Sequence, residues 1–581
     1  MKNLYPILLL LLPSFGLLAQ SNILITNPDF ETVLRGNHDP ADYSPTNMIN
    51  HPDDIFTDLI DRVSPDSMKA YLLHLSTFGN RNTGSDTLSN TFGIGAAQRW
   101  CYEKINQFSQ LNENRLITSY LQFDQSICAM DQHRNVMAVL PGMGPQKDEV
   151  VLIEAHLDSR CEDRCDVLCV AHGMEDNGSG SALVLELARV MSKYAINCSI
   201  VFRLTIGEQQ GLHGANALAT FSQFEDIKIH AVLNNDIVGG IICGSTASPP
   251  GCPGLNDIDS INVRIYSQGS LNSRNKSLAR FVKLEYQENI EPHVSVKTVI
   301  NLMSPEDRTG RGGDHIPFRE KGFRAIRFTS ANEHGDANPI PGYSDRQHST
   351  ADLLGVDTDG DSVIDSFFVD FNYLARNTII NGNAAAAAAM GPVPPLDFDL
   401  EEVPNGLKVI INDPNNYSLY RIGVRSFSSH DWDTVLTVTR ATDTIYSLNP
   451  GQLYVMSAST VDSNGIESLF SNEEFENFST DVDDLPPVSS GITLLQNRPN
   501  PFDEATTIGV LVEKVIEYEE ALIVVHDSRG RELARYPIDL SIGLQEILYD
   551  YQNHRYQPGI YSYSLFIDGK LFQTRQMVYA Y

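Results

Sequence analysis

Two apolar runs on either side of a glycine-rich turn decide the fold of this chain. The runs are VVLI at Val150–Ile153 and SIVFRLTI at Ser199–Ile206, and EDNGSGSALVLELARVMSKY lies between them at Glu175–Tyr194. Within that stretch, apolar residues of Ser181–Tyr194 recur with the 3.6-residue period of a helix that is buried on one face. A strand, a helix and a second strand in this order predict a parallel strand pair joined by a crossover helix.

The same alternation of apolar runs and helical periods extends over residues 62–390. Further strands are predicted at Ala231–Leu233 and Arg324–Thr329, and an alanine run at 384–389 closes the domain before a proline-rich linker. The predicted fold class is therefore α/β, with a mixed, mostly parallel sheet flanked by helices. Residues 21–61 are rich in Pro, Asn and Asp, and they are predicted to form a loosely structured lead-in.

Beyond residue 395 the pattern changes to short alternating strands, which are typical of β-sandwiches. Residues 396–476 are predicted to form one sandwich domain and residues 490–581 a second, with an acidic linker at 480–490 between them. A chain of 581 residues corresponds to about four domains, so a division into several units is expected.

The first twenty residues predict export. A basic residue at Lys2 is followed by an apolar run at Ile7–Leu12 and by small residues before Gln20, as in a secretory signal peptide at 1–20. This run is too short to span a bilayer, and no later stretch is long and apolar enough to predict a transmembrane anchor. The protein is expected to be secreted or held at the cell surface.

Composition argues against two classes of partner and favours disulfides. The 74 acidic residues outnumber the 42 basic ones, and the formal net charge of −32 repels nucleic acid and anionic membranes. The eight cysteines of an exported chain favour disulfides over free thiols. Cys161, Cys165 and Cys169 form a tight cluster, for which a zinc knuckle is the alternative, and Cys243 and Cys252 flank a Pro/Gly loop. The sequence leaves the pairing open.

Polar residues follow the predicted strands at the points where these strands end. His156 and Asp158 face the same side of an extended chain, as a metal-binding His and its supporting carboxylate do. Because the carboxyl ends of parallel strands meet at one edge of a sheet, the polar residues at these ends are expected to converge. Taken singly, each is more simply explained as a surface residue or a helix cap. Together they suit zinc: His156, Asp158, Asp176, Glu208, Asp236, Asp314, His315 and His348.

The order of the motifs is specific. His-x-Asp, Glu-Asp-Asn-Gly-Ser-Gly, Gly-Glu-x-x-Gly-Leu, Asn-Asp-Ile and a late His follow one another within residues 62–390. In this order they resemble the zinc-dependent exopeptidases of metallopeptidase family twenty-eight, which include bacterial aminopeptidases and have glutaminyl cyclases as relatives. By that resemblance, His156, Asp176 and Asp236 would bind one zinc. Asp176 would also bridge to a second zinc, which His348 would hold.

The same resemblance implies roles for the remaining residues. Glu208 would be the general base, Asp158 would support His156, and Asp314 and His315 would lie beside the substrate. The family usually has a second glutamate, a zinc ligand, where this chain has Gln209. An amide oxygen can still coordinate, but the missing charge predicts one tightly bound zinc and a second, weaker one.

The function that the resemblance implies is a secreted zinc aminopeptidase acting on peptide substrates. Metal-activated water would attack the peptide carbonyl, and Glu208 would take the proton from that water. Two other functions stay open. One is a binding or adhesion protein with an impaired peptidase domain, which Gln209 favours, and the other is a glutaminyl cyclase, which also suits the motif Asp314–Phe318.

Both C-terminal segments resemble known modules. Leu448–Tyr454 and Gly465–Ser468 are similar to the later strands of a fibronectin type III module. Leu495–Phe502 together with Pro558–Tyr561 resembles the C-terminal sorting domain of type IX secretion cargo. This second resemblance implies that the type IX secretion machinery is a partner, and that the tail carries the export address.

An acidic loop near the end of the α/β region resembles part of a calcium loop. Its aspartates match the first nine positions, but Phe368 stands where the bidentate glutamate belongs and the usual glycine at the sixth position is missing. Calcium is therefore weighed against a solvated acidic loop. The aspartates concerned are Asp357, Asp359, Asp361 and Asp365.

Overall fold

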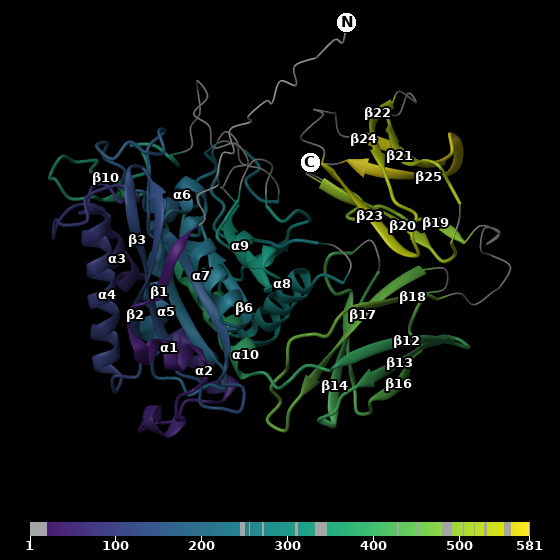
Figure 1. Ribbon diagram of the computed structural model, residues 1–581, viewed down its shortest axis with the longest axis horizontal. Coiled ribbons are helices and arrows are strands. Elements are labelled where there is room, and N and C mark those ends of the chain that lie inside the picture. The colour runs from purple at the N-terminus through teal and green to yellow at the C-terminus, as the bar shows by residue number, and fades with distance from the viewer. Residues whose placement is uncertain are drawn as a thin grey trace, which may run out of the picture.

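The computed structural model describes residues 20–579, apart from 245–249, 255, 270–271, 308–311, 332–345, 427–428, 450–451, 479–490, 503–504, 516, 528–531 and 551–558. The predicted signal peptide up to residue 19 and the acidic linker at 480–490 lie outside the described residues. Figure 1 shows an α/β domain on the left and two all-β domains, one above the other, on the right.

A nine-stranded sheet forms the centre of the α/β domain, in the order β1-β2-β3-β5-β4-β6-β9-β7-β8. The neighbouring strands β5, β4, β6 and β9 are parallel, whereas β1, β2 and β3 are antiparallel to their neighbours. The mixed α/β fold is confirmed, with the parallel pairing concentrated at the centre because helical crossovers connect those strands. The strands are β1 (Ser21–Ile25), β2 (Ile117–Ile127), β3 (Met130–Leu140), β4 (Glu149–His156), β5 (Ser199–Thr205), β6 (Lys228–Asn235), β7 (Asn262–Tyr266), β8 (Val299–Leu302) and β9 (Ala325–Ser330).

Helices cover both faces of this sheet. Alternate residues of β4 point to opposite faces of the sheet. Val151 and Ile153 lie in the core that is formed with α3, α4, α5, α8 and α10. Val150 and Leu152 lie in the core that is formed with α1, α7 and α9. The helix predicted at Ser181–Tyr194 is confirmed as α5. The helices are α1 (Pro28–Leu34), α2 (Pro52–Arg62), α3 (Pro65–Ser76), α4 (Gly93–Leu111), α5 (Gly180–Met191), α6 (Glu208–Gly211), α7 (His213–Phe224), α8 (Arg274–Glu285), α9 (His315–Glu320) and α10 (Phe371–Met390).

The lead-in segment is part of the α/β domain, so the expectation that it is loosely structured is wrong. Strand β1 pairs with the sheet edge at β2. Phe30 and Val33, three positions apart on α1, are fully buried in the core on one face. On the other face, Leu59 of α2 is fully buried. Apolar residues at helical spacing within a polar segment bury enough surface to hold these helices against the sheet.

Two antiparallel sandwich domains follow, as predicted. The first pairs sheet β12-β13-β16 with sheet β15-β14-β17-β18, and the second pairs β19-β20-β23 with β22-β21-β24-β25. Each encloses its own apolar core. Their strands are β12 (Asp397–Val403), β13 (Gly406–Asn412), β14 (Leu419–Ser426), β15 (Thr434–Val438), β16 (Thr442–Ile445), β17 (Gln452–Val461), β18 (Glu474–Phe478), β19 (Ile492–Leu494), β20 (Ala505–Val512), β21 (Ala521–His526), β22 (Glu532–Pro537), β23 (Gly543–Asp550), β24 (Gly559–Ile567) and β25 (Lys570–Tyr579).

Buried contacts join the three units. Glu473, which precedes β18, forms ion pairs with Arg280 of α8 at 2.5 Å and with Arg425 of β14 at 2.8 Å, and all three side chains are 1% exposed. Val455 of the first sandwich packs against Leu495 of the second. A buried carboxylate between two guanidiniums ties the first sandwich to the α/β domain, because separating the units would leave unpaired charges.

Disulfides are confirmed for both cysteine groups. Cys161 pairs with Cys169, and Cys243 pairs with Cys252. The third cysteine of the cluster, Cys165, pairs with Cys128, so no zinc knuckle forms there.

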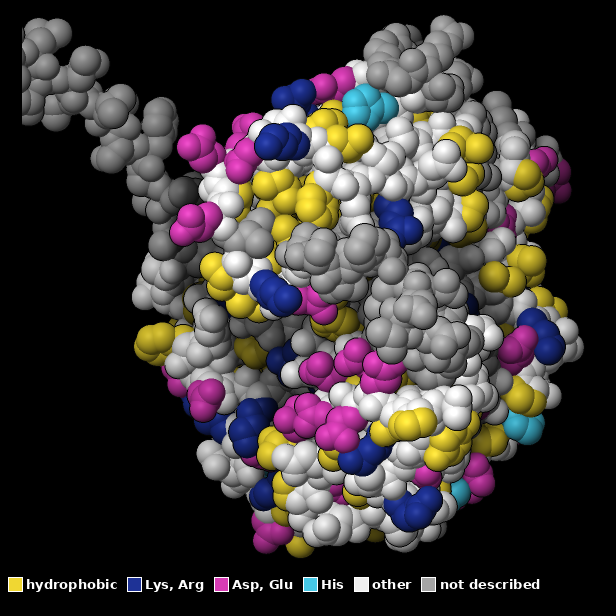
Figure 2. All heavy atoms as spheres, turned by 90° about the vertical axis from the view of Figure 1, so that its right-hand side faces the viewer, with side chains coloured by type: hydrophobic (Ala, Val, Ile, Leu, Met, Phe, Trp, Pro, Cys, Tyr) yellow, Lys and Arg dark blue, Asp and Glu magenta, His cyan; other side chains and the backbone are white. Residues whose placement is uncertain are grey.

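The exposed surface carries mixed charges. Figure 2 shows the face formed by the two sandwich domains, where apolar and basic side chains are scattered and a group of acidic ones lies near the centre. Among the helices of the described residues, none is long and apolar enough to cross a membrane.

Candidate metal centre

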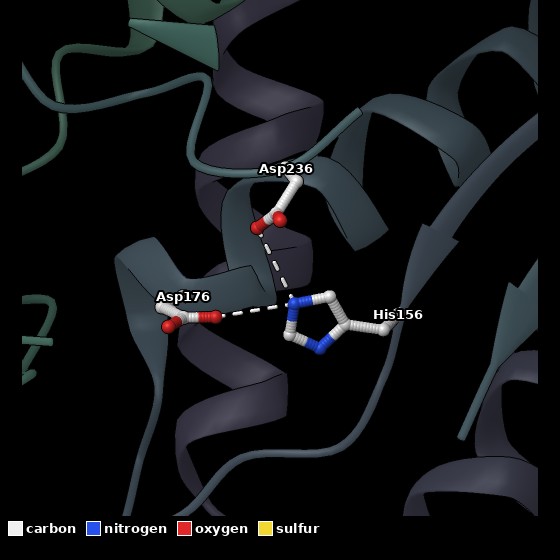
Figure 3. A group of neighbouring side chains, drawn as sticks. All are labelled: His156, Asp176 and Asp236. Atoms are coloured by element: carbon white, nitrogen blue, oxygen red, sulfur yellow. Dashed lines mark hydrogen bonds and ion pairs between the residues drawn. The ribbon is translucent and has the colours of Figure 1, made fainter. Parts of the chain in front are cut away.

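His156 lies at the carboxyl end of β4 and is 1% exposed. Its Nε2 lies 3.1 Å from Oδ1 of Asp176 and 3.3 Å from Oδ1 of Asp236. Figure 3 shows the two carboxylates pointing at this nitrogen from different parts of the chain. One ligand atom from each of the three residues lies within 4.8 Å of the others, which is a spacing that one metal ion can bridge.

The contact of Nδ1 shows which ring nitrogen of His156 carries the hydrogen. Nδ1 lies 3.0 Å from the backbone carbonyl of Asp158, and a carbonyl only accepts hydrogen bonds. In the neutral imidazole Nδ1 therefore carries the hydrogen, which leaves the lone pair of Nε2 for a metal ion. The Asp158 carboxylate accepts hydrogen bonds from Thr83 Oγ1 at 3.1 Å and from the backbone N–H of Gln209 at 3.1 Å. Asp158 thus supports His156 and the turn after β5 together.

Asp176 lies in the turn at residues 174–179 that precedes α5. Its backbone N–H and that of Glu175 donate to the two carboxylate oxygens of Asp352, at 3.0 and 2.9 Å. The turn presses against β6, since a β-carbon on Gly180 would lie 2.3 Å from the carbonyl oxygen of Asn235. Only glycine allows this approach, which brings Asp176 close to the end of β6.

Asp236 follows β6 directly, and a buried arginine fixes its orientation. Oδ2 of Asp236 accepts from Nη2 of Arg327 at 2.9 Å, and Arg327 also pairs with Asp307 at 2.7 Å. With Oδ2 held in this way, Oδ1 is directed at His156. Arg327 was not identified from the sequence, although a charged residue within the predicted apolar strand Arg324–Thr329 could have indicated a buried ion pair.

Glu208 opens α6 immediately after Gly207, whose φ of +72° turns the chain sharply at the end of β5. The Glu208 side chain is 12% exposed, and its Oε2 lies 3.8 Å from Nε2 of His156. Together with Asp176 and Asp236 it lines a cavity of about 170 Å³. Burial, reinforced by the neighbouring carboxylates, raises the pKa of Glu208 to about 8. A dication among these carboxylates would favour the ionised form and lower that pKa.

Gln209 and His348 lie on the far side of Asp176, and both contact Arg160. Gln209 Nε2 donates to Asp176 Oδ1 at 2.8 Å, while its Oε1 accepts from Arg160 Nε at 2.7 Å. His348 Nε2 lies 2.9 Å from Asp176 Oδ2, and its Nδ1 lies 2.7 Å from Arg160 Nη2. Sequence reasoning missed Arg160, although it lies only two positions beyond Asp158.

The two residues expected beside the substrate, Asp314 and His315, are fully buried and do not line the cavity. Burial lowers the pKa of His315 to about 4, so its imidazole is neutral at pH 7. Burial also raises the pKa of Asp314 well above its usual range, and Glu154 and Glu208 add to this shift.

The acidic loop lies apart from this site, between β10 (Gly355–Val356) and β11 (Ser366–Phe367). Oxygens of Asp357, Asp359 and Asp361 lie within 4.8 Å of one another, and all three residues are exposed. The Asp365 carboxylate instead accepts hydrogen bonds from the backbone N–H and the hydroxyl of Thr358. Calcium binding here stays a prediction.

The residues at the buried site fit one zinc ion. Imidazole nitrogen and carboxylate oxygen are both ligand types that zinc takes in proteins, and three protein ligands leave a position open for water or substrate. Burial opposes protonation of His156, yet Glu208, Asp158, Asp176 and Asp236 outweigh it and raise the pKa of His156 well above its usual range. The surroundings of this imidazole are therefore strongly negative, and a dication compensates such a charge.

Comparison with known proteins agrees with this geometry. Residues 135–361 match peptidase family M28. A probable zinc metalloprotease of Pyricularia oryzae is 31% identical over 359 residues, which are 59% of this chain and 68% of that protein. A probable zinc metalloprotease of Leptosphaeria maculans is 29% identical over 403 residues, which are 67% of this chain and 89% of that protein.

Two solved structures are more distant. The Legionella pneumophila LapA aminopeptidase is 17% identical, covers 59% of this chain and 76% of its own, and gives a TM-score of 0.42. The Porphyromonas gingivalis glutaminyl cyclase is 16% identical, covers 55% of this chain and 97% of its own, and gives a TM-score of 0.38. Neither similarity decides between the two activities for this chain.

Proposed function

This chain belongs to peptidase family M28 and is a zinc metallopeptidase, and from that premise we propose that it is a secreted aminopeptidase. One observation carries the proposal. Nε2 of His156 and the carboxylates of Asp176 and Asp236 converge at a cavity that Glu208 also lines. A metal-ligand triad beside a carboxylate that can accept a proton is the arrangement that hydrolysis of a peptide bond requires.

His156, Asp176 and Asp236 would hold the zinc ion. An ion held by these residues would supply Lewis-acid chemistry, polarising the scissile carbonyl and lowering the pKa of water toward neutrality. Around it, Asp158 keeps the hydrogen of His156 on Nδ1, and Arg327 keeps one oxygen of Asp236 directed at His156. These contacts fix the ligands before any substrate arrives, which reduces the reorganisation that the reaction needs.

Glu208 would act as general base and then as general acid. Its carboxylate is exposed enough to reach the cavity, and Gly207 holds it at the end of β5. It would accept a proton from the attacking water and donate one to the nitrogen of the leaving amine. A binding protein with an inactive peptidase domain would not require the zinc ligands or the general base. The presence of the ligand triad and of Glu208 therefore argues against that alternative.

The accessory domains are proposed to serve export and binding. The disulfides support a secreted protein, because such bonds form and persist in oxidising compartments. The first sandwich is proposed to be a fibronectin type III-like module, and the second a sorting domain for type IX secretion. In support of the second, the segment Leu495–Phe502 is anchored inside its own domain, where Tyr563 donates to the carbonyl oxygen of Leu495 and accepts from the backbone N–H of Asn497.

Hydrolysis assays test the proposal directly. We expect the purified chain to release the amine from aminoacyl anilides, and to leave N-acetylated forms of the same compounds intact. Treatment with a zinc chelator should abolish the release, and added zinc should restore it. Cyclisation of a peptide with N-terminal glutamine, without hydrolysis of the anilides, would instead establish a glutaminyl cyclase. Neither reaction in a zinc-loaded chain would favour a binding protein.

A further inference from the structure

The surroundings of Asp176 are asymmetric, and the asymmetry concerns the place of a second metal ion. On one side, Oδ1 lies 3.1 Å from Nε2 of His156, the nitrogen assigned to the first zinc. On the other side, Gln209 Nε2 lies 2.8 Å from Oδ1 and His348 Nε2 lies 2.9 Å from Oδ2. The groups on this second side present hydrogens to Asp176, as the contacts of Arg160 establish.

Arg160 decides which nitrogen of His348 carries a hydrogen. An arginine guanidinium only donates hydrogen bonds, and its Nη2 lies 2.7 Å from His348 Nδ1. Nδ1 must therefore accept, which leaves the hydrogen of the imidazole on Nε2. In this arrangement Nε2 donates to Asp176 Oδ2 and has no lone pair for a metal. His156 has the opposite arrangement, because its Nδ1 faces a carbonyl oxygen.

The same guanidinium fixes the amide of Gln209. Arg160 Nε donates to Gln209 Oε1 at 2.7 Å, so the oxygen that could ligate a metal is already an acceptor. The amide nitrogen then faces Asp176. Nη1 of Arg160 donates to the backbone carbonyls of Cys161 and Glu162, at 3.2 and 3.0 Å, which holds the guanidinium in place. Both side chains that the sequence assigned to a second metal are thus turned into donors toward Asp176.

We propose that Arg160 replaces the second metal ion, so that the active enzyme holds one zinc and Gln209 and His348 are not ligands. The guanidinium supplies a positive charge beside Gln209 and His348, and it orients both side chains so that they donate hydrogen bonds to the two oxygens of Asp176. Arg160 is in this sense a positioning residue that keeps Asp176 aimed at His156. The inference rests on the proposed function only for the ligand triad.

Zinc content per chain tests the proposal. The folded protein is dialysed against an excess of buffered zinc, and bound zinc is measured by elemental analysis. We expect one zinc per chain in the wild type, and hydrolysis that saturates at one equivalent. In Q209E the count should stay at one, because Arg160 still contacts His348. R160M/Q209E should bind a second zinc, because the new carboxylate and the released imidazole then become ligands.

The control is R164M, which removes another arginine that lines the cavity but leaves Arg160 in place. It should keep one zinc. Two zincs in the wild type would overturn the proposal and leave the proposed function standing. One zinc without peptide hydrolysis would contradict the proposed function and support this inference. An R160M/Q209E chain that melts like the wild type and still holds one zinc would also overturn the role of Arg160. If that variant fails to fold, the wild-type count decides.

Discussion

Nη2 of Arg327 lies 2.9 Å from Oδ2 of Asp236, so a buried guanidinium on β9 holds a carboxylate that follows β6. The two residues are far apart in sequence, and the parallel pairing of β6 with β9 brings them together. The contact leaves Oδ1 of Asp236 directed at His156. Partners of this kind determine how well a metal ligand is preorganised.

Replacing Arg327 with Met should therefore weaken zinc binding. Loss of a group that orients a ligand typically costs about 10–100-fold in metal affinity, and we expect a decrease of that size in R327M. Competition with a chromophoric chelator measures it. R35M is the matched control, because Arg35 pairs with Glu31 of α1 and with Glu225, which follows α7, and these pairs do not involve the triad. Equal affinities in R327M and R35M would show that Arg327 does not position Asp236.

Replacing Glu208 with Gln should remove turnover but not the metal. The amide cannot accept the proton of the attacking water, so kcat should fall by at least about a hundredfold. Zinc content should be unchanged, since Glu208 is outside the triad of His156, Asp176 and Asp236. Steady-state kinetics and elemental analysis of the same sample check both points. Turnover within a few-fold of the wild type would remove Glu208 from the mechanism.

Glu473 should stabilise the docking of the first sandwich in a pH-dependent way. Although burial opposes it, Arg280 and Arg425 lower the pKa of Glu473 to about 2, from an ordinary value of 4.5. A depressed folded-state pKa stabilises the fold above the unfolded value, and this contribution is lost as the pH falls from about 4.5 toward 2. E473Q leaves two buried guanidiniums poorly compensated, which should cost about 3–5 kcal/mol at pH 7.

Denaturant unfolding of the wild type and of E473Q measures this difference. It should be largest at pH 7 and clearly smaller at pH 3, because part of the wild-type contribution is then lost. E532Q serves as the control, since Glu532 pairs with Arg535 on an exposed strand. Loss of this exposed pair should change the free energy of unfolding little. A difference that does not depend on pH would contradict the role of the Glu473 charge.

A chain that ends at Asp481 should keep its peptidase activity. The residues that line the cavity lie between Arg160 and His348, far from the second sandwich in sequence. Truncation exposes Val455, which packs against Leu495, so we expect a lower melting temperature and a loss of about 1.5–3 kcal/mol. Thermal unfolding and anilide hydrolysis check the two statements. Loss of activity in a folded truncated chain would show that the second sandwich acts on the site.

In the native host, the same truncation tests the sorting assignment. Without the proposed export address, the truncated protein should accumulate in the periplasm, whereas the full chain should reach the surface or the medium. Fractionation and immunoblotting distinguish the two. A truncated protein that still reaches the medium would contradict the type IX assignment while leaving the peptidase proposal intact.

Local sequence patterns were enough to predict the strands and helices around the site and the edge of the sheet where they meet. The period of Ser181–Tyr194 and the apolar run at Val150–Ile153 are local patterns, and a helix and a strand form there. Parallel strands bring their carboxyl ends together, so the positions of His156, Glu208 and Asp236 after three such strands were enough to predict that they converge. The lead-in was misjudged because its polar composition hid the few apolar residues that pack on the sheet.

The side chains that orient these residues could be identified only once the domain was folded. Arg160 and His348 are 188 positions apart, and no local pattern indicates that one determines the proton of the other. The pairing of Cys165 with Cys128, rather than within its own cluster, likewise depends on how the turn after β2 packs. Periodicity and spacing are local properties of the chain. Hydrogen-bond partners and disulfide pairs depend on which surfaces the packing of the whole domain brings together.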